Sequence, residues 1–254
     1  MIVTHRIKNI VLWVLLVAVV GLFTTNVFLY RELRKFYALL YNSQLDPIGL
    51  SYFREDAGQI AGDKPIVVFY GDSRAAQWIA PQTDDYAFIN RGIGNQTSAQ
   101  VLLRFEEHIQ PLQPDVIILQ VCVNDLKTIP LFPERKDEII ATCENNIEAI
   151  LQKSRDLHSV VILTAVFPTS GNVPLARRLV WSDEVYEAID QVNAFILNYQ
   201  AEGVIVFDTS AILSDSDGNT KNEYTRDLLH LNSNGYDALN SELLTILDSL
   251  NAGK

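Results

Sequence analysis

Cysteine, histidine and positive charge are all scarce in this sequence. Two cysteines among 254 residues cannot form the dense set of disulfides that stabilises a small secreted domain. Cys122 and Cys143 leave the redox compartment open, and no cysteine and histidine cluster has the spacing of a zinc site. Lysine and arginine number 20 against 31 acidic residues, giving a net charge of −11 and arguing against a nucleic-acid partner, which needs a basic face. We therefore expect no metal, no cofactor and no nucleic acid.

Charge is missing altogether from one long stretch near the N-terminus. Residues 9–30 contain no charged side chain, and a helix of this length spans about 30 Å, the thickness of the hydrocarbon core. Trp13 and Tyr30 lie near its ends, as interfacial aromatic residues often do. A cleaved signal peptide is the alternative, but its apolar region is usually shorter and ends in small residues. The sequence therefore predicts an uncleaved anchor over residues 1–30.

The residues that follow the anchor predict a helix and then a linker. Residues 31–42 carry apolar side chains on one helical face, and residues 43–63 are interrupted by Pro47 and by several glycines. We expect residues 31–63 to join the anchor to a single domain over residues 64–254, which is long enough for a sizeable core. Positive charges before and after the anchor nearly balance, so the positive-inside rule does not decide its orientation.

Short apolar runs alternate with helical patterns through the rest of the chain. The runs predict strands at residues 66–70, 86–90, 115–123, 160–166 and 204–207. The helical patterns cover residues 75–80, 97–109, 136–156, 182–202 and 233–251. Continuously apolar strands separated by helices indicate a parallel sheet covered on both faces. We predict an α/β fold: a three-layer α/β/α sandwich whose five-stranded parallel sheet has the flavodoxin-like order 2-1-3-4-5.

Polar motifs follow four of the predicted strands. Ser73 follows the first, residues 90–98 with two glycines follow the second, and Asn124 follows the third. After the fifth, Asp227 and His230 are three residues apart, so that the carboxylate can orient the imidazole. Each motif alone has an ordinary explanation as a turn or a helix cap. Because ligands of such sheets bind beyond the carboxyl ends of the strands, the four together predict a nucleophile, a base and oxyanion donors at one site.

With these motifs the sequence resembles the SGNH, or GDSL, hydrolase family from about residue 66 to residue 247. The family's four blocks correspond to residues 71–74, 90–98, 122–125 and 227–236. The resemblance implies a triad of Ser73, Asp227 and His230 and an acyl-enzyme mechanism. It also implies an oxyanion hole built from the N–H groups of Ser73 and Asn95 and from the Asn124 amide.

Some positions support this assignment and others depart from the family pattern. Asp72 and Gly94, next to the nucleophile and to the oxyanion position, are assigned supporting roles. Asn95 stands where the family usually has glycine, but the expected donor is a backbone N–H that asparagine also has. Cys122 replaces another glycine, which puts the shape of the pocket in question. Arg74 replaces the common leucine.

The substrate is less well defined than the chemistry. Loops over residues 126–135 and 167–181 are candidates to shape an acyl pocket, in which Trp181 is either a wall or part of a helix cap. Arg177 and Arg178 either meet an anionic group or are solvated. Candidate substrates are small-molecule, glycan and lipid acyl esters. The alternatives to a plain esterase are an O-acyltransferase or O-acetylesterase acting on cell-envelope glycans, a lipid-directed esterase, and an inactive binding module. The resemblance also implies a catalytic domain outside the cytoplasm.

Overall fold

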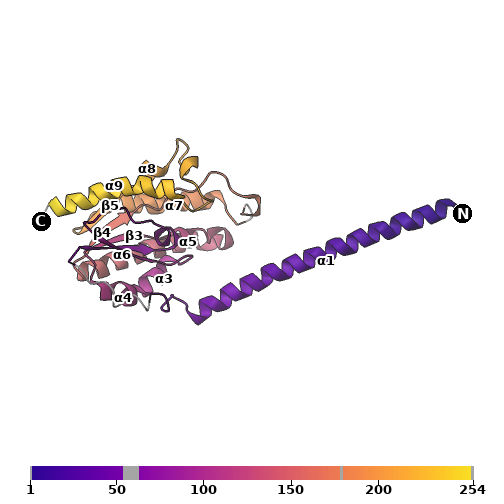
Figure 1. The fold of residues 1–254 in the computed structure, drawn as a ribbon, viewed down its shortest axis with the longest axis horizontal. Coiled ribbons are helices and arrows are strands. Elements are labelled where there is room, and N and C mark those ends of the chain that lie inside the picture. Colours follow the sequence, from indigo (N-terminus) through magenta and orange to yellow (C-terminus); the bar gives the residue numbers. More distant parts are fainter. Residues whose placement is uncertain (1, 54–62, 178–179, 253–254) are drawn as a thin grey trace. The chain divides into compact units, whose positions relative to one another are not determined.

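The computed structural model describes residues 2–53, 63–177 and 180–252, and the chain forms two compact units (Figure 1). The first unit comprises Met1–Pro47 and the second Ile48–Lys254. All four motifs that the sequence singled out belong to the second unit.

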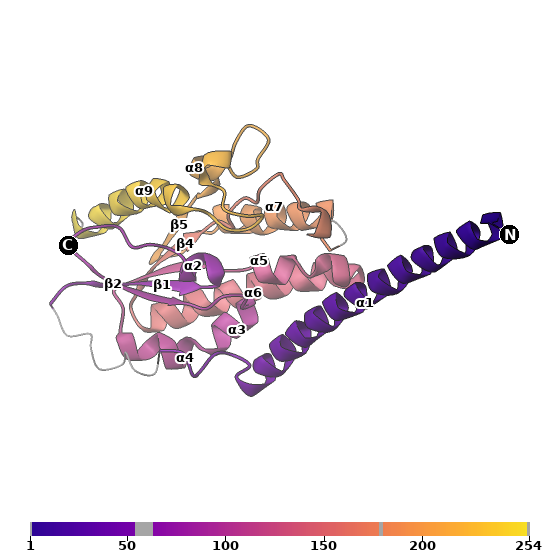
Figure 2. The same ribbon diagram turned by 45° about the vertical axis from the view of Figure 1, so that its right-hand side comes forward.

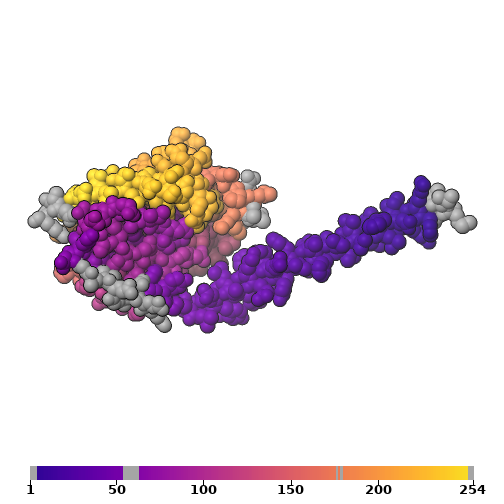
Figure 3. All heavy atoms as spheres, in the orientation of Figure 1, coloured from indigo at the N-terminus to yellow at the C-terminus, as the bar shows by residue number. Residues whose placement is uncertain are grey.

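The first unit consists of one long helix, α1 (Ile2–Leu45). Within it, His5–Leu45 contains a window of mean hydropathy 2.4, none of which is buried inside the protein. Figure 3 shows the coloured part of α1 as one continuous rod, drawn with all its heavy atoms. Among the described residues it is the one helix long and apolar enough to cross a membrane, a test that a signal sequence also passes. The predicted apolar helix is confirmed, and it continues without a break through the juxtamembrane helix expected after Tyr30.

The second unit is built on a five-stranded parallel sheet. Its strands are β1 (Ile66–Gly71), β2 (Ala87–Gly92), β3 (Val116–Gln120), β4 (Val160–Thr164) and β5 (Val204–Phe207). Their order is β2-β1-β3-β4-β5, and every neighbouring pair is parallel. The predicted fold class and strand order are therefore confirmed.

Helices connect these strands and cover both faces of the sheet (Figures 1 and 2). The α-helices are α2 (Ser73–Ala76), α3 (Ser98–Leu103), α4 (Phe105–His108), α5 (Val123–Leu126), α6 (Lys136–Asp156), α7 (Asp183–Leu197), α8 (Ser210–Leu213) and α9 (Ser233–Ala252). Short 3-10 helices are η1 (Gln110–Leu112), η2 (Ile129–Leu131), η3 (Pro133–Arg135), η4 (Leu175–Arg177) and η5 (Asn222–Tyr224).

Alternating strand side chains divide the core into two layers. Val68 and Tyr70 of β1 pack in the layer that also contains buried residues of α3, α4, α6 and α7. Val67 and Phe69 point to the opposite face and pack in the layer that contains those of α8 and α9. This alternation follows from the two-residue period of a strand. Because both faces are covered, the sheet is exposed to ligands only at its edges and strand ends.

Two predicted elements end earlier than their hydrophobic patterns suggest. The third strand stops at Gln120, because Cys122 has a φ of +86°, a conformation that does not continue a strand. The helix predicted over residues 97–109 is divided into α3 and α4 at Arg104, a fully buried residue. In both places the apolar pattern of the sequence continues, but the regular element is interrupted at Cys122 or at Arg104.

Residues 48–53 pack on the domain, although we expected them to be part of a linker. The Gln96 side-chain amide donates to the backbone carbonyl of Ile48 at 2.9 Å. The Phe53 ring lies 4.6 Å from the Arg91 guanidinium and meets the His108 ring edge-on at 5.3 Å. The second unit accordingly begins at Ile48 and not at residue 64. The remaining residues of the expected linker, 54–62, lie outside the described residues.

Candidate active site

Ser73 follows the tight turn between β1 and α2, beyond the carboxyl end of β1. Gly71 ends β1 with a φ of +149°, and a Cβ atom at this position would overlap the carbonyl oxygen of Gln120. Asp72 then caps α2, since its Oδ1 accepts a hydrogen bond from the backbone N–H of Arg74 at 2.8 Å. The glycine and the cap together hold Ser73 as the first residue of the short helix.

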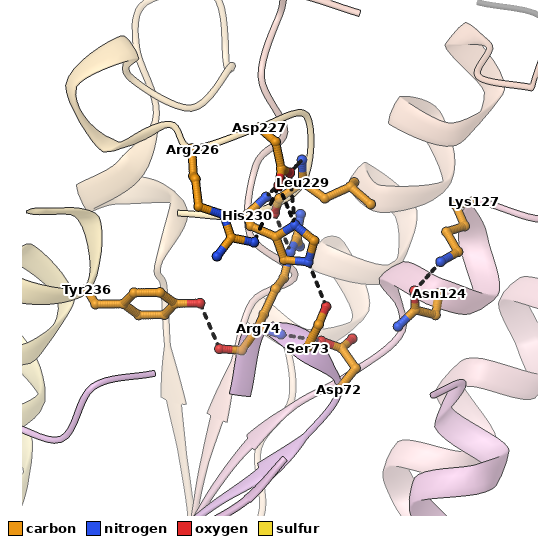
Figure 4. Close-up of polar contacts among 10 residues, drawn as sticks. All are labelled: Asp72, Ser73, Arg74, Asn124, Lys127, Arg226, Asp227, Leu229, His230 and Tyr236. Atoms are coloured by element: carbon orange, nitrogen blue, oxygen red, sulfur yellow. Dashed lines mark hydrogen bonds and ion pairs between the residues drawn. The ribbon is translucent and has the colours of Figure 1, made fainter. Parts of the chain in front are cut away.

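The structure brings the three candidate triad residues into one hydrogen-bonded row (Figure 4). The Ser73 hydroxyl oxygen lies 2.9 Å from Nε2 of His230. On the other side of the ring, Nδ1 lies 2.8 Å from Oδ1 and 2.9 Å from Oδ2 of Asp227. A carboxylate only accepts hydrogen bonds, so Nδ1 carries the ring proton and Nε2 is left to accept from the serine.

The local charges favour this arrangement of protons. Burial raises the pKa of Asp227, but hydrogen bonds from the backbone N–H of Leu229 and from the side chain and backbone of His230 outweigh it and lower the pKa to about 2. Burial is the main influence on His230 and lowers its pKa below the ordinary value, although Asp227 opposes this. At neutral pH the aspartate is therefore ionised and the imidazole is neutral, as a general base must be.

The candidate oxyanion residues come from the loops after β2 and β3. A Cβ atom on Gly94 would lie 3.9 Å from the Cβ of Ser73, so this loop runs beside the serine. Asn95 has a φ of +67°, the left-handed conformation that explains why glycine is usual at this position. The Asn124 side chain is 4% exposed, and its Nδ2 donates to the carbonyl oxygen of Gln96 at 2.9 Å.

Lys127 is a site residue that the sequence analysis missed. Its ammonium donates to Oδ1 of Asn124 at 2.5 Å (Figure 4). It also donates to Oδ1 of Asn95 at 2.7 Å. Lys127 is three residues after Asn124, the spacing at which side chains on a helical turn are neighbours. That spacing was the available signal for the first contact. The contact with Asn95 depends on how two separate loops approach each other.

A disulfide and a buried carboxylate fix the loop that carries Asn124. Cys122 is fully buried and pairs with Cys143 of α6, with a Cα–Cα distance of 5.9 Å. Asp125 accepts hydrogen bonds from the backbone N–H of Ser98 at 2.8 Å and from its hydroxyl at 2.7 Å. The loops after β2 and β3 are thus joined to each other and to α6.

Arg74 fixes the turn that carries Ser73 in a similar way. This fully buried side chain donates from Nε to the carbonyl of Leu229 at 2.9 Å and from an amino group to the carbonyl of Phe167 at 3.0 Å. The Tyr236 hydroxyl donates in turn to the carbonyl of Arg74 at 2.9 Å. These bonds connect the turn that carries the serine with the loop that carries the histidine.

Asp72 and Arg74 are buried charges that influence each other. Burial raises the pKa of Asp72 to about 6, against the opposing effect of Arg74. Burial lowers the pKa of Arg74 to about 10, and Asp72 opposes that shift. The arginine is therefore charged at neutral pH, while the aspartate changes its charge near pH 6.

The loops over residues 126–135 and 167–181 were expected to shape a pocket for the acyl group, and the structure bears this out only in part. A cavity of about 600 Å³ includes Pro168 and Thr169 from the loop after β4, but its described lining contains no residue of the candidate triad. Trp181 is 7% exposed and packs in the core, where its ring meets Tyr186 edge-on. It therefore belongs to the packing around α7. Arg178 lies outside the described residues.

The three-layer fold places the candidate site beyond the carboxyl ends of the strands, where such sheets bind their ligands. Residues 61–238 match the GDSL-like Lipase/Acylhydrolase family, and the chain belongs to that family. It is accordingly an esterase. No curated protein matches the sequence.

Solved structures show the same fold at low sequence identity. A structure from Streptococcus pneumoniae, assigned as a platelet activating factor, is 24% identical with a TM-score of 0.65, covering 84% of this chain and 99% of that chain. A GDSL-like lipase from Bacteroides thetaiotaomicron is 20% identical with a TM-score of 0.62, covering 80% and 98%. An acetylxylan esterase from Geobacillus stearothermophilus is 17% identical with a TM-score of 0.51, covering 73% and 94%.

Proposed function

We propose that this esterase is a serine hydrolase in which Ser73 attacks the ester carbonyl, His230 is the general base and Asp227 orients the imidazole. The observation that carries the proposal is the hydrogen-bonded row of the three side chains, with 2.9 Å between the serine Oγ and the histidine Nε2. Such contact between nucleophile and base, with the base oriented by a third group, is the arrangement that nucleophilic catalysis requires.

The proposed reaction proceeds through an acyl-enzyme. His230 takes the proton of the Ser73 hydroxyl while its oxygen bonds to the carbonyl carbon, and negative charge develops on the carbonyl oxygen. The backbone N–H groups of Ser73 and Asn95 and the amide of Asn124 stabilise that charge. The protonated histidine then gives its proton to the departing alcohol. Water repeats the sequence and releases the acid.

Asn124 can act as a donor in this scheme although one of its bonds is already made. A side-chain amide carries two N–H donors, and the carbonyl of Gln96 accepts one of them at 2.9 Å. The second is left for the substrate. Loss of one oxyanion donor lowers kcat by roughly 10²–10³ in other enzymes, and we expect an effect of this size for Asn124→Ala.

We further propose a single-pass membrane enzyme whose catalytic domain, from Ile48 onward, lies outside the cytoplasm. The apolar helix α1 supports the anchor, and the disulfide between Cys122 and Cys143 supports an oxidising compartment, where disulfides persist. We accordingly propose esterified glycans of the cell envelope and lipid esters as its candidate substrates. Acyl transfer from the acyl-enzyme to a sugar hydroxyl in preference to water would identify an O-acyltransferase.

The test is turnover of a panel of acyl esters by the full chain in detergent micelles, together with labelling by a fluorophosphonate. Ser73→Ala and His230→Ala should each abolish most turnover, and Ser73→Ala should also abolish labelling. Ser241→Ala is a matched control, because its exposed hydroxyl only donates to a carbonyl of its own helix. Wild-type rates in Ser73→Ala would refute the proposal.

A further inference from the structure

The Lys127 side chain connects two loops beside the candidate nucleophile. It follows α5 directly, and its ammonium donates to Oδ1 of Asn124 on α5 and to Oδ1 of Asn95 in the loop after β2. Both asparagines are assigned to the oxyanion hole. We propose that Lys127 is a positioning residue of this hole, holding both donors in place and adding a positive charge beside them. The proposal rests on the function proposed above.

The first part of the argument concerns the orientation of the Asn124 amide. An amide has a donating end and an accepting end of similar shape, so a neighbour that can only donate or only accept determines which way round it lies. An ammonium only donates, and it binds the oxygen end at 2.5 Å. The carbonyl of Gln96 only accepts, and it binds the nitrogen end. Lys127 and Gln96 therefore fix one orientation together, with the second N–H left for the substrate.

The second part concerns the residue at position 95. The left-handed φ of +67° would be adopted more easily by glycine, which the resemblance makes usual here. Asparagine tolerates this conformation, and in addition it offers a side-chain oxygen that Lys127 binds at 2.7 Å. Asn95 thus provides a tether between the two loops that glycine does not provide.

The third part is electrostatic. The chain has a net charge of −11, which does not favour the development of negative charge on a substrate. A half-buried ammonium bonded to two oxyanion donors supplies charge of the opposite sign where it is needed, and it polarises the amide to which it is bonded.

The ammonium state of Lys127 also gives the proposal a distinctive pH dependence. Burial is the main influence that lowers the pKa of Lys127, and Arg177 and Arg74 lower it as well. Asp72 and Asp125 oppose them. The protonated form is the one that donates to both asparagines. The rate should therefore fall as pH rises through a pKa below the ordinary lysine value of about 10.4.

The experiment measures kcat and KM of the full chain in detergent micelles with 4-nitrophenyl acetate, from about pH 7 to 10.5 with spontaneous hydrolysis subtracted. Lys127→Met should lower kcat by roughly 10- to 100-fold with little change in KM, because the interaction acts on the transition state. Its alkaline fall in rate should disappear. Lys127→Arg should keep part of the rate and lose the alkaline fall, since arginine stays charged.

Two further variants keep the result interpretable. Lys153→Met removes a partly exposed lysine of α6 that pairs with Glu106 at 2.8 Å, and it should leave kcat and the pH profile unchanged. Asn95→Gly keeps the backbone N–H and the left-handed φ but removes the tether. It should lower kcat by a few-fold, and it tests the proposal even where Lys127→Met does not fold.

The possible results separate this proposal from the one on which it rests. If Ser73→Ala is inactive while Lys127→Met keeps the wild-type kcat and alkaline fall, the role of Lys127 is refuted and the serine mechanism stands. If Ser73→Ala is active, the proposed function itself is refuted. A loss in Lys127→Met that appears only in KM would also overturn the positioning role.

Discussion

Replacing Cys122 and Cys143 together separates two contributions to the loop that carries Asn124. One is the covalent bond itself, and the other is the φ of +86° at position 122, which disfavours every residue except glycine. Two double variants distinguish them. Cys122→Ala with Cys143→Ala removes the bond and keeps a side chain at the left-handed position. Cys122→Gly with Cys143→Ala removes the bond and relieves the conformation.

The magnitudes follow from the structure. The two cysteines are 21 residues apart, and closing a loop of this size lowers the entropy of the unfolded chain by an amount worth about 3 kcal/mol. A left-handed φ costs a residue with a side chain about 1–2 kcal/mol. Glycine avoids this cost, but the greater freedom of its unfolded state cancels part of the gain in stability. We expect the free energy of unfolding to fall by about 3 kcal/mol in the alanine variant. The glycine variant should recover about 1 kcal/mol of that loss.

The assay is urea denaturation of the full chain in detergent micelles, followed by the fluorescence of Trp78 and Trp181 in the domain core, with kcat measured on the same samples. The glycine variant should also have the higher kcat, because Asn124 is two residues from the relieved position. Both variants lack the disulfide, so oxidation state does not complicate their comparison. Equal stability and equal kcat in the two variants would refute the argument from conformation.

Two other predictions concern the segment after the anchor and the acid limb of the rate. Gly49→Ala and Gly218→Ala both place a side chain at a positive φ, but a Cβ atom at Gly49 would approach Cδ1 of Ile93 to 2.8 Å, whereas nothing lies within 4 Å at Gly218. Gly49→Ala should therefore lower both kcat and the thermal unfolding temperature. Gly218→Ala should lower only the thermal unfolding temperature. Equal kcat in the two variants would contradict a link between residues 48–53 and the candidate active site. The base must be neutral, and the pKa of His230 is lowered, so kcat/KM should fall with decreasing pH through a midpoint below about 6.5. Asp72→Asn should leave the midpoint of this acid fall unchanged. If the midpoint moved in Asp72→Asn, the fall would be assigned to Asp72, whose pKa is about 6, and not to His230.

The strand order and the position of the candidate triad could be predicted because both depend on local patterns. Apolar runs that alternate with helical periods specify a doubly covered parallel sheet. The topology then brings Ser73 and His230 to the same edge, although they are 157 residues apart. The spacing of Asp227 and His230 was enough to predict their hydrogen bond.

The features that escaped prediction depend on contacts between distant segments. The loops of Asn95 and Lys127 meet only in the folded chain, and the alternation of strands and helices carries no information about that contact. The packing of Phe53 on Arg91 was likewise missed, because proline and glycine around it indicate a linker. The disulfide between Cys122 and Cys143 was not predicted either, because it depends on where α6 lies in the fold.

The two buried arginines have a consequence for how the site comes into existence. Arg74 bonds to carbonyls 93 and 155 residues further along the chain, and Arg104 bonds to the carbonyls of Gly71 and Arg91. The bonds of Arg74 can form only after these long loops have closed, which favours their formation late in folding, whereas Arg104 joins segments only 13 and 33 residues apart. Buried without these carbonyls, a guanidinium would lose hydration and gain nothing in return. The nucleophile and base thus reach each other only in the completed fold, and a partly folded chain has no partial site. Recovery of ester turnover during refolding is therefore a measure of global folding.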